Sequence, residues 1–233
     1  MPIIVVTGAT SGVGLEISKT FIRLGWKVIG LARNFAKLKA LKADLGEQFD
    51  YMRTDISQST SVNEAFKYIA EQYGEIDVLV NNAAIFVMKP FADSTIEDID
   101  RVININLKGA MYCTFNALKL LKPNTSRIIN IGSVAGEHGI KNQSIYCASK
   151  FGLDGFAEAL NQELVGYGIS ITTICPGGID TPLWNEDTNP YPAGDTSKLL
   201  TAQGIANMVE SVTIQPNNVV LKKIILFPSN EWH

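Results

Sequence analysis

The chain has 233 residues, 46% of them hydrophobic, and a formal net charge of −3. This length and apolar content suit a single α/β domain, while the charge excludes the basic surface typical of nucleic-acid-binding proteins. The sequence has neither an apolar run near the ~18 residues of a membrane span nor a secretory signal, so we expect a cytoplasmic protein without a membrane partner. Its cysteines are not at paired spacing, so we expect no disulfide and no metal.

Apolar runs rich in Ile and Val alternate with helix-period segments along almost the whole chain. This alternation predicts βαβ units and a parallel sheet covered by helices on both faces. We expect the longest helix to run from about Ile96 past Ala117, after a capping box of the form Ser94-Thr95-Ile96-Glu97. The predicted domain spans residues 1–233, with strands at Ile3–Thr7, Lys27–Ala32, Phe49–Arg53, Val78–Asn81, Arg127–Ile131, Ser170–Ile174 and Lys223–Phe227.

The first predicted strand ends in a glycine-rich turn, Thr7-Gly8-Ala9-Thr10-Ser11-Gly12-Val13-Gly14. Glycines at a strand-to-helix turn let backbone N–H groups approach a pyrophosphate, and the helix N-terminus adds partial positive charge. Glycines also serve in tight turns and helix caps. This turn, however, follows a strand and opens an amphipathic helix, and it therefore predicts a dinucleotide site.

Tyr146 and Lys150 are one turn apart in a helix predicted from Tyr146 to Gly168, so their side chains meet on one face. A Tyr that transfers protons near pH 7 needs its pKa lowered by about 3 units, and a cation about 4 Å away supplies about 4 kcal/mol at an effective dielectric of about 20. Such pairs also occur by chance on helices. Ser133, however, follows a predicted strand at the sheet edge where ligands bind, and we therefore predict a proton-transfer site in which Lys150 lowers the pKa of Tyr146.

Together these motifs resemble the short-chain dehydrogenase/reductase family in its compact single-domain branch. The resemblance implies a Rossmann-type, doubly wound parallel sheet of seven strands, a nicotinamide cofactor, and hydride transfer between that cofactor and an alcohol or carbonyl. Homo-oligomers are usual in the family, so we expect a homodimer or homotetramer. The matching residues follow in the family's order: Thr7-Gly8-x-x-x-Gly12-x-Gly14, Asn81-Asn82-Ala83-Ala84, Asn106, Ser133, Tyr146, Lys150, Pro176-Gly177 and Thr181.

The resemblance also implies roles for individual residues. Ser133 would bind the substrate carbonyl and Tyr146 would transfer the proton. Lys150 would bind the nicotinamide ribose, and Asn106 would hold a water in a proton relay. The implied cofactor-binding residues are Gly8, Thr10, Ser11, Gly12, Val13, Gly14, Asp55, Ile56, Asn82, Ala83, Tyr146, Lys150, Pro176, Gly177, Ile179 and Thr181.

Arg33 ends the second predicted strand. At this position NAD-binding proteins carry an acid for the ribose 2′-hydroxyl, and NADP-binding proteins place an Arg near the 2′-phosphate. The run from Val28 to Arg33 contains no acid, and a guanidinium suits phosphate oxygens. A solvated Arg at a strand end is the alternative. We predict that the cofactor is NADP(H).

The sequence thus predicts an NADP(H)-dependent oxidoreductase that interconverts a carbonyl and a secondary alcohol, with a small-molecule partner. A non-catalytic nucleotide-sensing regulator is one alternative, although all four catalytic residues are present. A nucleotide-sugar epimerase or dehydratase is another, although only about fifty residues follow Pro182.

Substrate selection is expected in a loop at about residues 177–198 and in residues 137–143. Ile140, Trp184 and Tyr191 are candidates for an apolar pocket wall or for plain packing. The C-terminal half is similar to members of the branch that act on small hydroxy acids, including serine.

Overall fold

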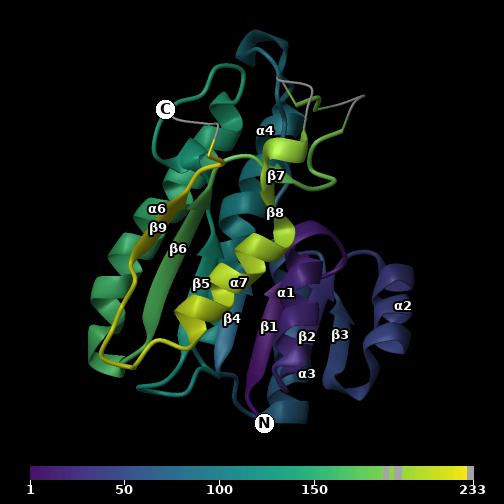
Figure 1. Ribbon diagram of the computed structural model, residues 1–233, viewed down its shortest axis with the longest axis vertical. Coiled ribbons are helices and arrows are strands. Elements are labelled where there is room, and N and C mark those ends of the chain that lie inside the picture. Colours follow the sequence, from purple (N-terminus) through teal and green to yellow (C-terminus); the bar gives the residue numbers. More distant parts are fainter. Residues whose placement is uncertain (186–188, 192–195, 230–233) are drawn as a thin grey trace.

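The computed structural model, in which residues 1–185, 189–191 and 196–229 are described, is built on a parallel sheet of seven strands (Figure 1). Their order is β3-β2-β1-β4-β5-β6-β9. Successive strands are therefore added on one side of β1 up to β3 and on its other side from β4 onward, and the strand order reverses between β1 and β4. The predicted strands are confirmed, with β6 two residues longer than expected and β9 one residue shorter. Their bounds are Ile3–Thr7 (β1), Lys27–Ala32 (β2), Phe49–Arg53 (β3), Val78–Asn81 (β4), Arg127–Ile131 (β5), Ser170–Pro176 (β6) and Lys223–Leu226 (β9).

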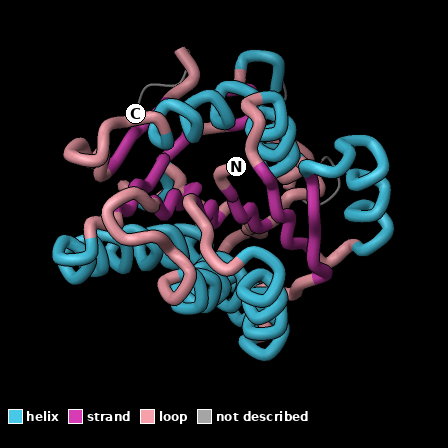
Figure 2. Tube along the Cα trace, turned by 90° about the horizontal axis from the view of Figure 1, so that it is seen from below, coloured by secondary structure: helices cyan, strands magenta, loops and turns pink. Residues whose placement is uncertain are grey.

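Helices cover both faces of the sheet, as the view along it shows (Figure 2). Side chains alternate between the faces of a strand, so Val5 packs into one apolar core and Ile4 and Val6 into the other. This arrangement confirms the doubly wound fold. One face carries α1 (Gly12–Arg23), α2 (Phe35–Leu45) and α7 (Ala202–Thr213); the other carries α3 (Ser59–Tyr73), α5 (Ala110–Ala117) and α6 (Ser144–Leu164).

The capping box lies one residue later than the sequence suggested. Asp98 N–H donates to Thr95 Oγ1 and Thr95 N–H donates to Asp98 Oδ2, each over 3.1 Å. The predicted pair Ser94 and Glu97 was wrong because Thr95, with extended backbone, is the residue from which α4 (Ile96–Ile103) starts.

The long helix is not uniformly α-helical. A π-helical segment at Asn104–Gly109 separates α4 from α5. Such segments insert an extra residue into a turn and are frequent at functional sites. Here the segment contains Asn106, one of the predicted site residues.

The predicted substrate loop is partly structured. A short strand β7 (Ile179–Asp180) pairs with β8 (Leu200–Thr201) in a two-stranded sheet that the sequence did not predict. Residues 186–188 and 192–195 of the loop, and the chain end at 230–233, lie outside the described residues. Within the described part no helix combines the length and hydropathy needed to cross a membrane, and the cytoplasmic location stays a prediction.

Candidate active site

A cavity of about 1000 Å³ lies at the carboxyl edge of the sheet, where β1 to β6 end. Ligand pockets are typically about 300–1,000 Å³, so this cavity can hold a large ligand. Gly14 and Asn106 do not line it. The structure brings the other predicted site residues together on its lining: Gly8, Thr10, Ser11, Gly12, Val13, Arg33, Asp55, Ile56, Asn82, Ala83, Ser133, Tyr146, Lys150, Pro176, Gly177, Ile179 and Thr181.

The glycine turn joins β1 to α1 and lines one part of the cavity. Gly8 and Gly12 have positive φ angles of 70° and 51°, which glycine adopts without strain. Ser11 is the N-cap of α1 but makes no side-chain cap hydrogen bond. The first turn of α1 therefore presents backbone N–H groups that no cap covers, an arrangement that suits an anionic phosphate.

Asn82, the residue after β4, braces this turn. Its side chain donates to the Thr7 carbonyl over 2.8 Å, and its backbone N–H donates to Thr7 Oγ1 over 2.9 Å. The Ala83 N–H donates to the same hydroxyl over 3.0 Å. These bonds hold together the ends of β1 and β4, the two neighbouring strands between which the strand order reverses.

Gly14 packs beneath the turn instead of facing the cavity. A Cβ at this position would lie 2.4 Å from the Gly8 carbonyl oxygen and 2.6 Å from Asn82 Nδ2. We expect Gly14→Ala to lower the free energy of unfolding by about 1–3 kcal/mol, because overpacking shifts the backbone, and to weaken dinucleotide binding. Urea unfolding and a cofactor titration measure the two effects.

Gly155→Ala in α6 is the matched control for Gly14→Ala, since a Cβ there meets nothing within 4 Å. It should stabilise the protein by about 0.5–1 kcal/mol through helix propensity. Equal stability of the two variants would show that the close approach at Gly14 is not limiting.

Arg33 and Asp55 lie at the end of the cavity formed by β2 and β3. Arg33 follows β2 directly and is exposed. Asp55 Oδ1 accepts hydrogen bonds from the Ser57 N–H over 3.0 Å and from the Ser57 hydroxyl over 2.7 Å. Ile56 packs closely against Gly109. This end therefore presents one cation, one oriented carboxylate and an apolar side chain to a ligand.

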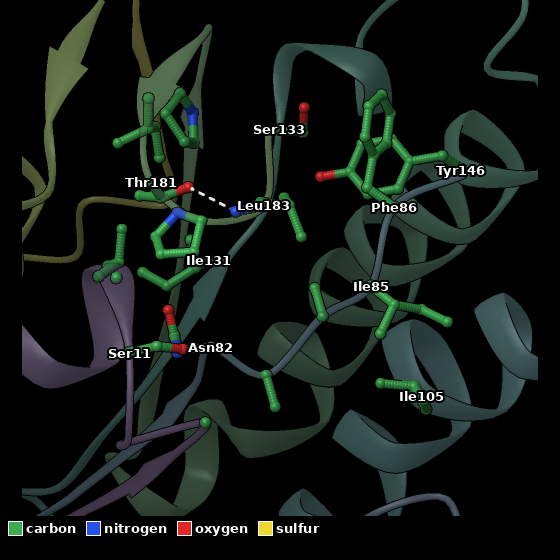
Figure 3. Close-up of a pocket in the computed structure, with 18 of the residues that line it drawn as sticks. Ser11, Asn82, Ile85, Phe86, Ile105, Ile131, Ser133, Tyr146, Thr181 and Leu183 are labelled. Carbon is green, nitrogen blue, oxygen red and sulfur yellow. Dashed lines mark hydrogen bonds between the residues drawn. The ribbon is translucent and has the colours of Figure 1, made fainter. Parts of the chain in front are cut away.

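Ser133, Tyr146 and Phe86 lie together at one end of the pocket, and Ser11 and Asn82 lie at the other (Figure 3). Ser133 follows β5 by two residues, and its Oγ accepts from the Ala135 N–H over 3.1 Å. Tyr146 comes from the first turn of α6. Phe86 meets the Tyr146 ring edge to face, with centroids 4.9 Å apart.

Lys150 is one turn beyond Tyr146 on α6, as predicted, and both side chains are buried, 3% and 8% exposed. Lys150 Nζ donates to the Ile131 carbonyl over 2.8 Å and lies 5.6 Å from the centroid of the Tyr146 ring. The ammonium is therefore held between the end of β5 and the tyrosine.

The pKa values differ from the sequence expectation. Burial raises the pKa of Tyr146 to about 12, although a hydrogen bond with Ser133 acts in the opposite direction. Burial also lowers the pKa of Lys150 to about 8. The predicted lowering of the Tyr146 pKa by Lys150 is absent here, because burial disfavours both charged forms.

Lys150→Met should reveal this buried amine in the cofactor-free protein. The pKa of Lys150 is about 8 in the folded protein and 10.5 in the unfolded chain. Between these two pH values the unfolded chain binds more protons than the folded protein, so the free energy of unfolding rises with pH. We expect wild type to gain about 3 kcal/mol of unfolding free energy relative to Lys150→Met from pH 8 to pH 10.5. Urea unfolding across this range measures the difference, and a constant difference would contradict the low pKa.

Asn106 is buried, and its side-chain amide makes three hydrogen bonds to protein groups. Its Oδ1 accepts from the Ile85 N–H over 2.8 Å, and its Nδ2 donates to the Ile85 carbonyl over 2.9 Å and to Ser149 Oγ over 3.1 Å. The side chain thus ties the π-helical segment to the chain after β4 and to α6. The predicted role in holding a water stays a prediction.

Phe86 is the main residue that the sequence reasoning missed. It lies on the irregular chain after β4, and no motif or periodicity marks it. Ile140, Trp184 and Tyr191 line the cavity, as expected of a pocket wall. Ile140 and Trp184 also pack against the buried cluster that contains Phe86 and Tyr146, so the two expectations hold together for these residues. Gln143 also lines the cavity, from the predicted specificity region 137–143.

Comparisons with known proteins agree with this geometry. A family model described as short chain dehydrogenase matches residues 2–191. A serine 3-dehydrogenase of Agrobacterium fabrum is 30% identical over 234 residues, covering 98% of this chain and 94% of that protein. A 3beta-hydroxysteroid dehydrogenase of Mediterraneibacter gnavus is 35% identical over 189 residues, covering 78% of this chain and 67% of that protein.

Among solved structures, the closed form of a serine dehydrogenase complexed with NADP⁺ superposes with a TM-score of 0.90. It is 30% identical, and the match covers 99% of this chain and 96% of that one. The family match spans most of the chain and includes the glycine turn, Ser133, Tyr146 and Lys150. The chain therefore belongs to the short-chain dehydrogenase family and is an oxidoreductase of that family.

Proposed function

We propose that the protein is an NADP(H)-dependent oxidoreductase that interconverts a carbonyl compound and a secondary alcohol. The observation that carries the proposal is one cavity that joins the glycine turn, Arg33, and the group of Ser133, Tyr146 and Lys150. The uncapped start of α1 suits a pyrophosphate, and the exposed guanidinium of Arg33 suits a 2′-phosphate. A similar solved structure is complexed with NADP⁺.

The chemistry follows from the three residues at the end of β5 and on α6. The bound nicotinamide would supply the hydride. Because Ser133 Oγ accepts from the Ala135 N–H, its own hydroxyl hydrogen can be donated to the substrate carbonyl, where negative charge develops. Tyr146 would then deliver the proton as general acid, and would accept it in the reverse direction.

Lys150 would assist from the adjacent turn. Its Nζ is fixed on the Ile131 carbonyl and can offer its remaining hydrogens to a ribose hydroxyl. When charged it favours the phenolate of Tyr146, and burial opposes that effect. Asn106 would hold the water that returns the proton to Lys150, with its side chain fixed by Ile85 and Ser149.

NADPH consumption with a panel of ketones tests the proposal. A ketone-dependent loss of NADPH supports it. A nucleotide-sensing regulator would bind NADPH without consuming it, and an epimerase or dehydratase would act on nucleotide sugars instead. The names of the relatives leave two kinds of alcohol open, an amino acid such as serine and a neutral hydroxysteroid.

We also propose that the protein forms a homodimer or homotetramer through α5 and α6. Phe115 on α5 and Phe151 on α6 are large apolar side chains that are 64% and 46% exposed, and an interface that covers them would remove this apolar surface from water. Light scattering is expected to give two or four times the mass of the chain. The double variant Phe115→Glu, Phe151→Glu should shift this mass to that of a monomer, and a wild-type monomer would overturn the proposal.

A further inference from the structure

We propose that the substrate is a neutral carbonyl compound with an aromatic or bulky apolar substituent, and that serine and other small acids are excluded. This inference rests on the proposed function, and it concerns the part of the cavity beyond Ser133 and Tyr146. It is carried by an aromatic wall, which we define as Phe86, Trp184 and Tyr191, and by the distribution of charge around it.

The aromatic wall begins at the catalytic tyrosine and continues outward. Phe86 packs edge to face on Tyr146 at 4.9 Å and on Trp184 at 5.3 Å, with interplanar angles of 78° and 77°. Trp184 packs in the same manner on Tyr191 at 5.1 Å. All of these residues line the cavity. A substituent on the reacting carbon therefore meets aromatic surface, which favours apolar and aromatic groups.

Hydrogen bonds hold the aromatic wall in place from behind. Asn189 of the substrate loop donates to the Phe86 carbonyl over 3.1 Å and accepts from the Met88 N–H over 3.1 Å. Ile140, also on the lining, donates its N–H to Cys147 Sγ over 3.4 Å, and it packs against the same cluster as Trp184. The wall is therefore a built surface that joins the chain after β4 to the substrate loop.

The cations on the described lining are Arg33 and Lys150. Lys150 already donates a hydrogen bond to the Ile131 carbonyl and lies beside the Tyr146 ring. Arg33 follows β2, which is separated from β5 and Ser133 by β1 and β4, a distance of about 14 Å at the usual strand spacing. In sequence, residues 186–188 and 192–195 contain no Lys or Arg.

A substrate carboxylate in this part of the cavity would thus lack a basic partner. Burying an ionised carboxylate without a cation or several donors is strongly unfavourable. Gln143, at the N-cap of α6, is a neutral polar side chain on the lining and can donate one or two hydrogen bonds. It suits an ester, hydroxyl or second carbonyl better than a carboxylate.

Three methyl ketones test the inference. Benzylacetone and levulinate carry a phenyl ring and a carboxylate, respectively, at the same distance from the ketone, and methyl levulinate replaces the charge with a small neutral ester. With NADPH, kcat/KM for benzylacetone should exceed that for levulinate by about 100-fold, since an unpaired buried charge weakens binding by at least this factor. Methyl levulinate should fall between them.

Two variants of the lining and one control sharpen the test. Trp184→Ala should lower kcat/KM for benzylacetone about tenfold, because it removes aromatic contact, and should change methyl levulinate much less. Gln143→Arg should raise kcat/KM for levulinate by supplying the missing cation. Trp26 packs on Phe21 outside the cavity. The control variant Trp26→Phe should therefore leave the ratios of kcat/KM among the three ketones unchanged.

The outcomes separate this inference from the proposed function. If levulinate is reduced with NADPH, or serine is oxidised with NADP⁺, as efficiently as benzylacetone is reduced, the substrate class is overturned while the nicotinamide-dependent chemistry stands. Binding is measured independently by calorimetry on Tyr146→Phe loaded with NADPH. Preferential binding of benzylacetone without turnover by wild type would support the inference and contradict the proposed function, and equal or absent binding of both ketones would overturn the inference.

Discussion

Replacing Tyr146 with Phe is expected to lower kcat at least about 1,000-fold, because the general acid is lost. The hydroxyl removed is the group that faces Ser133, whereas the buried ring and its contact with Phe86 remain. The fold should therefore survive, and the dissociation constant of NADPH should change less than about threefold, since one of many contacts is altered. Single-turnover kinetics and a fluorescence titration of NADPH measure the two quantities.

Tyr167→Phe provides the matched control for this experiment. It removes the same hydroxyl group from a tyrosine that is 63% exposed and lies after α6, outside the cavity. Its kcat should equal that of wild type. Near-normal turnover by Tyr146→Phe would remove the proposed mechanism, because the structure then offers no role for the phenol.

The second large effect concerns the choice between the two nicotinamide cofactors. Arg33→Asp exchanges the cation at the end of β2 for an acid that repels a 2′-phosphate and can accept from a 2′-hydroxyl. The ratio of kcat/KM for NADPH to that for NADH should fall by about 100-fold or more, given the strength of a charge-assisted bond. Steady-state kinetics with each cofactor measure the ratio.

Lys39→Asp introduces the same change of charge on α2 at an exposed residue that does not line the cavity. It should alter the cofactor ratio only slightly, through long-range electrostatics. If Arg33→Asp changes the ratio no more than this control, Arg33 does not recognise the phosphate.

The strands could be predicted because both faces of a parallel sheet are buried. A run such as Ile3–Thr7 then needs apolar residues at nearly every position, and this signal is local. The two-stranded sheet of β7 and β8 escaped prediction because each strand has two residues, too few for any pattern. The π-helical segment also escaped, since its six residues are too few to reveal the extra residue in a turn.

At the site, motif residues were predictable and environment was not. The glycine turn, Ser133, Tyr146 and Lys150 were identified from spacing and resemblance, and the structure brings them to one cavity. Phe86 and the high pKa of Tyr146 depend on how distant segments pack around α6. Such burial is a tertiary property and leaves no mark in the neighbouring sequence.

The most direct test of the central claim is to follow the hydride itself. The wild-type protein is incubated with benzylacetone and NADPH carrying deuterium at the transferable positions, and the alcohol product is analysed by mass spectrometry. We expect one deuterium on the carbinol carbon, with none incorporated by Tyr146→Phe over the same time. Alcohol without deuterium, or equal labelling by both proteins, would contradict the central claim.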